Sequence, residues 1–161
     1  MLIDYGNLGV IRLKNYEYGY EYEIANSEVT IIGYLESDKD VIIPSEIDGF
    51  PVTAIGKWTF ADKQLRSVTI PDSVTSIEAG AFNPNQLTSA TIPDSVTSIE
   101  SFAFSDNKLT SVTIGSSVTF IGEGAFAKNQ LTHIALPSSV TNIGMLAFWN
   151  NPLMSVIIGD I

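Results

Sequence analysis

The stretch that decides the fold is residues 87–108, LTSATIPDSVTSIESFAFSDNK, which the chain repeats with few changes. LRSVTIPDSVTSIEAGAFNPNQ precedes it from Leu65, LTSVTIGSSVTFIGEGAFAKNQ follows from Leu109, and LTHIALPSSVTNIGMLAFWNNP follows from Leu131. A shortened copy, LMSVIIGDI, begins at Leu153, so the leading leucines lie 22 residues apart. A constant period of this length predicts a solenoid in which each repeat forms one turn.

Each slot of the repeat L-x-x-V-x-I-P-x-x-V-x-x-I-x-x-x-A-F-x-x-N carries one chemistry. Apolar slots that stack from turn to turn predict a continuous core, represented in one repeat by Leu87, Ile92, Val96, Ile99, Ala103 and Phe104. The alternation of polar and apolar residues over residues 111–114 predicts a short strand with Val112 and Ile114 facing inward. Residues 118–121 predict a second strand, and the Ala-Phe step predicts a single helical turn. The fold class is therefore a solenoid, either of α/β type or mostly β.

Two further slots predict the corners of each turn. Pro lacks a donor and Gly permits a sharp turn, so both end the first strand, at Pro71, Pro93, Gly115, Pro137 and Gly159. An Asn column recurs at Asn85, Asn107, Asn129 and Asn151. We expect these amides to satisfy backbone groups of neighbouring turns, the alternative being a row that binds a ligand.

The amino-terminal part departs from the repeat in a way that predicts a cap. Residues 38–64 fit one atypical repeat if five extra residues lie between Pro44 and Val52. Upstream, alternating tyrosines in residues 16–24, a turn near Asn26 and Ser27, and the apolar residues 29–32 predict a β-hairpin. Its tyrosines serve either as a lid on the solenoid or as a carbohydrate-stacking face.

The domain organisation follows from these patterns. Residues 1–37 form an amino-terminal segment with the capping hairpin, and residues 38–161 form the solenoid. The solenoid contains one atypical first repeat, four full 22-residue repeats and one truncated repeat. The first ten residues have neither a basic region nor an apolar core, so they are not a secretory signal.

Composition excludes several classes of function. The chain of 161 residues has 8 Lys and Arg against 18 Asp and Glu, a net charge of -10 that disfavours nucleic acids and anionic membranes. No apolar run approaches the roughly 18 residues of a membrane span, so we expect no membrane insertion. The chain has no cysteine and one histidine, His133, which leaves no zinc ligand set and no catalytic triad.

Two short acidic columns are the remaining candidates for a metal or for acid-base chemistry. Asp72 stacks on Asp94, and Glu78 stacks on Glu100. Paired carboxylates can bind Ca²⁺ or act as acid and base, but both columns end after two members. We interpret them as a solvated flank that keeps the solenoid soluble. We therefore expect no catalytic residue, no metal site and no cofactor, and the protein is not expected to be an enzyme.

The chain resembles the treponemal-type, or BspA-like, leucine-rich repeats over about residues 20–161. The resemblance rests on IPSEIDGFPVTAIG, which ends at Gly56, and on the repeated IPDSVTSI-x-x-x-AF at residues 70–82 and 92–104. It implies a right-handed superhelix of leucine-rich repeats. It also implies a secreted or bacterial cell-surface location and adhesion to protein or cell-surface ligands.

The outward residues of the first strand are the expected binding face. Its three columns are Thr69, Thr91, Thr113, Ala135 and Ile157; Ser67, Ser89, Ser111, His133 and Ser155; and Arg66, Thr88, Thr110, Thr132 and Met154. Small hydroxyls suit broad, water-bridged contacts, and an ice-binding face is a weaker alternative. The columns lose their regularity towards the carboxyl end, which makes His133, Ala135, Met154 and Ile157 candidate binding residues, with the aromatics Phe120 and Trp149.

Three other interpretations of this carboxyl end stay open. The irregular residues pack against a following repeat, or two chains meet end to end as a homodimer through the uncapped last repeat. A third interpretation makes the repeats a structural spacer or an oligomerisation domain of a larger protein. The leading hypothesis is a non-enzymatic interaction or adhesion module.

Overall fold

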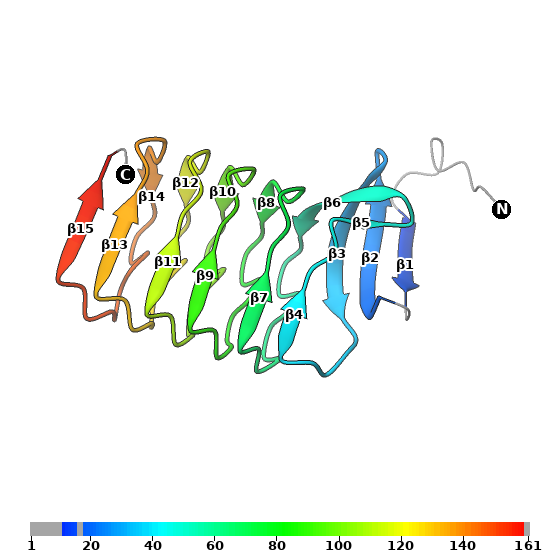
Figure 1. Cartoon of the computed structure of the whole chain (residues 1–161), viewed down its shortest axis with the longest axis horizontal. Helices are drawn as coiled ribbons and strands as arrows, with labels where there is room; N and C mark the ends of the chain where they lie inside the picture. The colour runs from blue at the N-terminus through cyan, green and yellow to red at the C-terminus, as the bar shows by residue number, and fades with distance from the viewer. Residues whose placement is uncertain (1–10, 16–17, 160–161) are drawn as a thin grey trace.

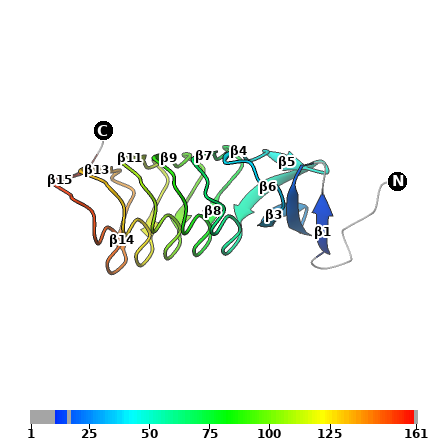
Figure 2. The ribbon, with the colours of Figure 1, turned by 90° about the horizontal axis from the view of Figure 1, so that it is seen from below.

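The computed structural model describes residues 11–15 and 18–159, which form a β-solenoid with two sheets on opposite sides (Figures 1 and 2). The described residues contain no helix. Each full repeat contributes one strand to each side, and successive turns add strands in the same order along the long axis. The mostly β form of the predicted solenoid is the one that the chain adopts.

The first-strand sheet consists of parallel strands from successive turns. They are β4 (Asp40–Ile42), β7 (Ser67–Thr69), β9 (Ser89–Thr91), β11 (Ser111–Thr113), β13 (His133–Leu136) and β15 (Ser155–Ile158). These strands lie in one row and pair two by two, β4 with β7, β9 with β11 and β13 with β15. The register places equal slots of the repeat opposite each other, as with Ser89 and Ser111. The outward residues therefore form straight columns across this sheet.

The second sheet lies on the other side of the solenoid and contains the amino-terminal hairpin. Its order is β1 (Ile11–Asn15), β2 (Tyr20–Ala25), β3 (Glu28–Tyr34), β6 (Phe50–Ile55), β8 (Ser76–Ile77), β10 (Ser98–Ile99), β12 (Phe120–Ile121) and β14 (Asn142–Ile143). β2 and β3 pair antiparallel, and the positive φ angles of Asn26 and Ser27 form the predicted tight turn between them. β3 then pairs parallel with β6, so the hairpin continues the sheet at the first turn.

The five extra residues of the first repeat form a small hairpin. Ile42 pairs with Thr69, 27 positions on, whereas Ala54 pairs with Ser76, 22 positions on. Between them β5 (Glu46–Ile47) pairs antiparallel with β6 through Asp48 and Gly49, which both have positive φ. The predicted insertion is confirmed, and its Asp-Gly pair supplies the left-handed conformation that a two-residue turn requires.

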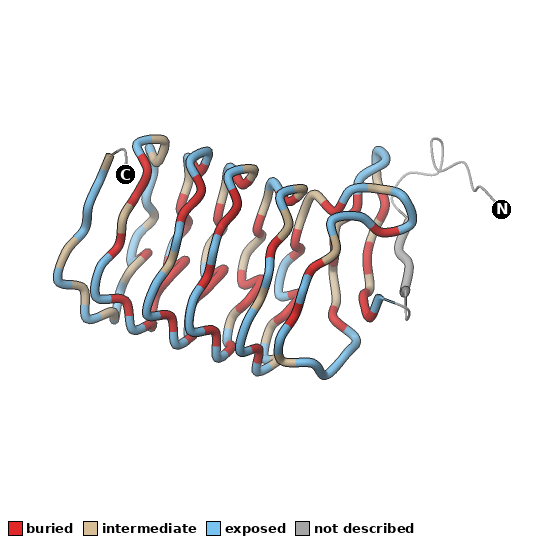
Figure 3. Tube along the Cα trace, viewed as in Figure 1, coloured by how far each residue is buried: buried red, intermediate tan, exposed pale blue. Residues whose placement is uncertain are grey.

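The core is the predicted apolar column between the two sheets (Figure 3). Its most regular part is a ladder of phenylalanines, one per turn, with ring centroids 5.0–5.6 Å apart and nearly parallel planes. The members of the ladder are Phe60, Phe82, Phe104, Phe126 and Phe148. Each ring stacks on the rings of the neighbouring turns, so the stability of each turn depends on the turns beside it.

The tyrosines of the hairpin close the amino-terminal end of this core. Tyr20, Tyr22 and Tyr34 are buried, and Tyr20 and Tyr34 pack their rings against Phe60. Burial raises the pKa of Tyr20, and the nearby Tyr34 adds to the rise. These three tyrosines thus pack as the predicted lid does, whereas Tyr18 of the same alternating stretch is 46% exposed. Tyr16 lies outside the described residues.

The asparagine ladder has the architectural role that the sequence predicts. The Asn107 Oδ1 accepts the Leu87 N–H at 3.0 Å, and its Nδ2 donates to the Phe82 carbonyl at 3.0 Å and to the Phe104 carbonyl at 3.3 Å. Asn85, Asn129 and Asn151 make equivalent bonds. Each amide therefore joins two turns and satisfies backbone groups at the corner.

The predicted helical turn at the Ala-Phe step is wrong. The N–H of Phe104 donates to the Ala125 carbonyl of the next turn at 2.8 Å, and Ala103 closes a tight turn on Glu100 at 3.2 Å. Phe102, which precedes this step, has a φ of 60°. A left-handed residue cannot continue a right-handed helix, so the backbone forms hydrogen bonds between turns instead.

Candidate functional site

Most of the first-strand sheet presents the small hydroxyls that the sequence predicts. Thr69, Thr91 and Thr113 are exposed and occupy the same slot of successive repeats, and Thr91 pairs directly with Thr113. The column also begins with an isoleucine that the sequence analysis missed, since Ile42 pairs with Thr69 and is 77% exposed. Both ends of this column are therefore apolar.

The sheet changes character on its last two strands. We call His133, Ala135, Met154 and Ile157 the C-terminal sheet surface. Ala135 pairs with Ile157, and His133 pairs with Ser155 beside Met154. Met154 is 80% exposed and Ile157 is 57% exposed. The structure thus brings His133, Ala135 and Ile157 onto two neighbouring strands, with Met154 directly before β15.

Two kinds of apolar exposure occur on β15 and have different causes. Val156 and Ile158 occupy the slots of Ile134 and Leu136, which are buried one turn earlier, so they belong to the core column of the last turn. Ile157 occupies the outward slot of Thr113, which stays exposed in the middle of the sheet. A neighbouring turn would cover the first pair and leave the C-terminal sheet surface accessible.

Phe120 and Trp149 lie away from this surface. Phe120 is on β12 in the second sheet, where it pairs with Ser98 and Asn142 and is partly buried. Trp149 is 53% exposed in the turns that follow the second strands. The structure therefore separates the candidate residues into three regions.

Trp149 lines a groove of about 440 Å³ along these turns, which we call the turn groove. Its apolar lining also includes Trp58, Phe102 and Leu146, which are 53%, 39% and 56% exposed. Sequence reasoning missed these three residues because they recur every 44 residues and alternate with Gly80 and Gly124. A Cβ atom on Gly80 would collide with the Trp58 indole, and one on Gly124 would collide with the Phe102 ring.

The backbone under the turn groove is strained where its large side chains stand. Trp58, Phe102 and Leu146 have φ angles of 56°, 60° and 58°. This left-handed conformation costs bulky residues about 1–2 kcal/mol each, and glycine avoids the cost at the same slot in Gly80 and Gly124. Asp62, Asp106, Lys128 and Asn150 are left-handed as well, so this conformation recurs in the turns of the solenoid.

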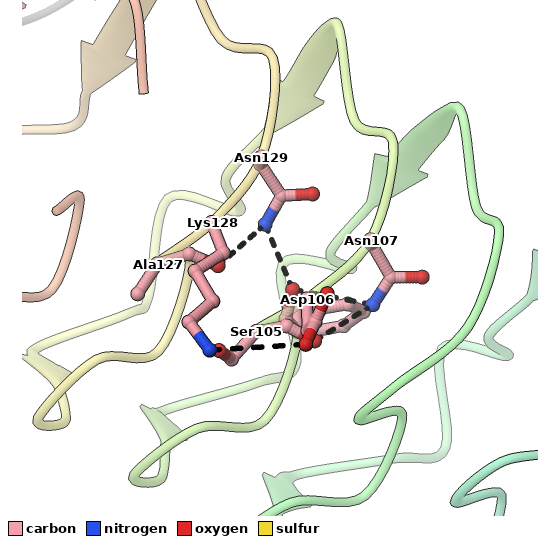
Figure 4. Close-up of polar contacts among 7 residues, drawn as sticks. Ser105, Asp106, Asn107, Ala127, Lys128 and Asn129 are labelled. Atoms are coloured by element: carbon pink, nitrogen blue, oxygen red, sulfur yellow. Dashed lines mark hydrogen bonds and ion pairs between the residues drawn. The ribbon is translucent and has the colours of Figure 1, made fainter. Parts of the chain in front are cut away.

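Polar side chains also line the turn groove, and Figure 4 shows the contacts that Ser105, Asp106 and Lys128 make with their neighbours. The Lys128 ammonium lies 3.9 Å from the Asp106 carboxylate, and both residues also line a second, polar hollow of about 610 Å³. That hollow is rich in amide side chains, namely Asn107, Asn129, Gln130, Asn150 and Asn151. Aromatic faces and planar hydrogen-bonding groups thus lie side by side.

The acidic columns contain no metal-binding cluster in the described part of the chain. Asp94 instead accepts hydrogen bonds from the Ser116 N–H at 2.7 Å and the Ser116 hydroxyl at 3.0 Å. These bonds hold the pKa of Asp94 below its usual range. Asp94 therefore joins two turns at the surface.

Within the same described residues, no helix is long and apolar enough to cross a membrane.

Comparison with known proteins gives one family and several solved structures. The model of the BspA type leucine-rich repeat region matches residues 49–160 in 6 copies. A leucine-rich cell surface protein of Faecalibacterium prausnitzii is 25% identical with a TM-score of 0.56, and the match covers 92% of this chain but 54% of that protein. No curated protein matches in sequence.

Two further solved structures share the fold. A leucine-rich repeat protein of Bacteroides capillosus is 25% identical with a TM-score of 0.57, and the match covers 91% of this chain and 97% of that one. One from Bacteroides ovatus is 24% identical with a TM-score of 0.67, and the match covers 98% of this chain and 40% of that one. The chain thus spans about half or less of the length of two of the three similar structures.

Proposed function

Because the chain belongs to the BspA-type leucine-rich repeat family, we propose that it is a non-enzymatic module that binds another protein through the C-terminal sheet surface. Repeat proteins of this kind typically bind proteins, because stacked turns present an extended and rigid face. The similarity to a leucine-rich cell surface protein supports a bacterial surface or secreted location and a role in adhesion.

The observation that carries the proposal is the exposure of Met154 and Ile157 on an otherwise hydroxyl-lined sheet. Large apolar side chains gain free energy when a partner removes them from water, by about 25 cal/mol per Å² of apolar area. Exposed apolar groups that cluster, with a polar rim, mark protein interaction sites. The serine and threonine columns beside them form such a rim and hold the sheet at low net charge.

The direct test replaces both residues by the threonine that earlier turns carry, in Met154→Thr with Ile157→Thr. We expect binding to immobilised collagen, laminin or fibronectin to fall at least tenfold for whichever protein the unchanged chain binds. Ile42→Thr is the matched control, since it makes the same change at the other end of the same column. Equal binding by the unchanged chain, the double variant and Ile42→Thr would rule out the C-terminal sheet surface as the binding site. The absence of any protein partner would favour the spacer hypothesis.

The exposed core residues support a second proposal, the end-to-end homodimer. Val156 and Ile158 are 49% and 72% exposed although their slots are buried in the preceding turn. A second copy would cover them by pairing its own last turn against β15. Sedimentation should then show a monomer-dimer equilibrium that Ile158→Asp abolishes, and a monomer at every concentration would refute the dimer.

A further inference from the structure

We propose that the turn groove is a second binding site, independent of the C-terminal sheet surface, and that its ligand is a neutral β-1,4-linked glycan. The inference rests on three features: aromatic faces at a fixed spacing, planar polar groups beside them, and a charge balance that disfavours anionic ligands.

The spacing of the large residues sets the length of the ligand. Trp58 and Phe102 stand two turns apart, and Phe102 and Leu146 another two. Because consecutive phenylalanines of the core ladder lie 5.2 Å and 5.0 Å apart, residues two turns apart lie about 10 Å apart along the axis. The disaccharide unit of an extended β-1,4-linked glycan has about this length. We call Trp58, Phe102 and Leu146 the platforms. Each platform would thus contact every second sugar of the glycan, and the contacted sugars would all have the same orientation.

The alternation with glycine gives each aromatic ring room to pack over the next turn. The Trp58 indole covers the backbone of Gly80, and the Phe102 ring covers the backbone of Gly124. One ring face rests on the protein, while the exposed fractions of 53% and 39% leave area open to solvent. A sugar ring presents C–H groups that stack on such a face, and the strained backbone fixes the platforms before any ligand arrives.

The polar edge supplies the hydrogen bonds that a sugar requires. Asn83, Ser105, Asp106 and Glu123 line the turn groove, and the amide-rich hollow continues past Asp106 and Lys128. Asn83, Gln130 and Asn150 add amide groups outside the asparagine ladder, and these amides with the Asp106 and Glu123 carboxylates can donate to and accept from sugar hydroxyls. This arrangement suits a ligand that has an apolar ring face and a hydroxyl-rich edge.

Charge selects a neutral glycan among these ligands. The charged residues of the turn groove are Asp106, Glu123 and Lys128, and the Lys128 ammonium is balanced by Asp106 at 3.9 Å. The remaining carboxylate and the net charge of -10 repel uronic acids and phosphates. An extended peptide fits less well, because backbone groups on this ridge already bond between turns, as in Phe102 N–H to the Glu123 carbonyl at 2.8 Å.

The chain carries its own probe for this site. It contains two tryptophans, and both line the turn groove. Titration with cellohexaose and with chitohexaose should therefore change the intrinsic fluorescence, and one of them should bind more tightly than its disaccharide because it spans at least two platforms. A hexamer of galacturonic acid is the anionic control and should leave the fluorescence unchanged.

Variants make the test specific to the platforms. Phe102→Ala should weaken binding of the hexasaccharide roughly tenfold and affect the disaccharide less, because only the longer ligand bridges Trp58 and Phe102. Trp58→Phe should retain binding in calorimetry. Ile42→Ala is the matched exposed control, and Met154→Thr with Ile157→Thr should leave glycan binding unchanged.

Circular dichroism should give the same spectrum for all these variants, which separates a lost ligand contact from a lost fold. The proposal is overturned if neither hexasaccharide changes the fluorescence or releases heat at millimolar concentration. It is also overturned if folded Phe102→Ala binds the hexasaccharide as tightly as the unchanged chain. If Phe102→Ala lost a protein partner and the unchanged chain bound no glycan, the turn groove would be a protein recognition site. That result would also refute the glycan proposal.

Discussion

The two ends of the first-strand sheet carry the same residue type in the same column, but in different surroundings. Ile42 begins the column beside Asp40, which forms an ion pair with Arg66 and accepts a hydrogen bond from Ser67. Ile157 ends the column beside Ala135, and Met154 directly precedes the strand that carries Ile157. One exposed isoleucine among charged groups is ordinary protein surface, whereas several apolar side chains together form a candidate interface.

The core shows the same contrast between its ends. At the amino-terminal end Tyr20 and Tyr34 pack on Phe60, which is fully buried. At the carboxyl end Phe148 is partly buried, and Val156 is 49% exposed. Identical repeat chemistry therefore gives different burial, because each turn is stabilised by the turns on both of its sides.

The largest expected effect is on the phenylalanine ladder. Phe60→Ala leaves a cavity beneath the tyrosine lid and should lower the free energy of unfolding by about 3–5 kcal/mol. Phe148→Ala removes a side chain that is already partly solvated, so its loss should be about 1–2 kcal/mol. Urea denaturation followed by circular dichroism measures both, and equal losses would contradict the difference between the two ends.

An intermediate effect is expected on the asparagine ladder. Asn85→Ala leaves the Leu65 N–H and the Phe60 and Phe82 carbonyls without their buried partner, at a cost of about 1–3 kcal/mol. Asn151→Ala should cost under about 1 kcal/mol, because water reaches the groups that this half-buried amide serves. Urea denaturation measures the loss of unfolding free energy for both variants. A larger loss for Asn151→Ala than for Asn85→Ala would contradict the expected order.

The smallest effect concerns acid stability at the amino-terminal end. Hydrogen bonds from Ser67 and Arg66 hold the pKa of Asp40 below its usual value. A depressed pKa contributes stability above the unfolded value of about 3.9, and this contribution is lost as the pH falls through the folded pKa. Asp40→Asn should therefore lower Tm slightly at pH 6 and leave it unchanged at the most acid pH where the chain stays folded. A decrease in Tm that is the same at both pH values would contradict this assignment.

The regular part of the fold could be predicted because each slot repeats its chemistry. Leu87, Val96 and Phe104 recur with the same neighbours in every turn, so their burial follows from the period alone. The helical turn could not be excluded in this way. The left-handed Phe102 is set by bonds between turns, and an isolated repeat contains no such bonds.

The candidate site was only partly accessible from the sequence. Met154 and Ile157 depart from their columns in the sequence, and the structure leaves both exposed at the last turn. Phe120 departs from its own slot in the same way, but it lies on the predicted second strand, and the structure places it on β12 in the other sheet. The turn groove was missed because its signal is an alternation of large residues with glycine over two turns, as in Trp58 and Gly80.

The most direct test of the account compares two variants of the first-strand sheet in one binding measurement. The first restores the regular residues at the irregular end, in His133→Ser, Ala135→Thr, Met154→Thr and Ile157→Thr. The second removes the hydroxyls of the regular part, in Thr69→Ala, Thr91→Ala and Thr113→Ala. Surface plasmon resonance with the immobilised protein partner should show that the first variant loses binding at least tenfold and that the second binds within about twofold of the unchanged chain. Full binding by the first variant and loss by the second would contradict the account.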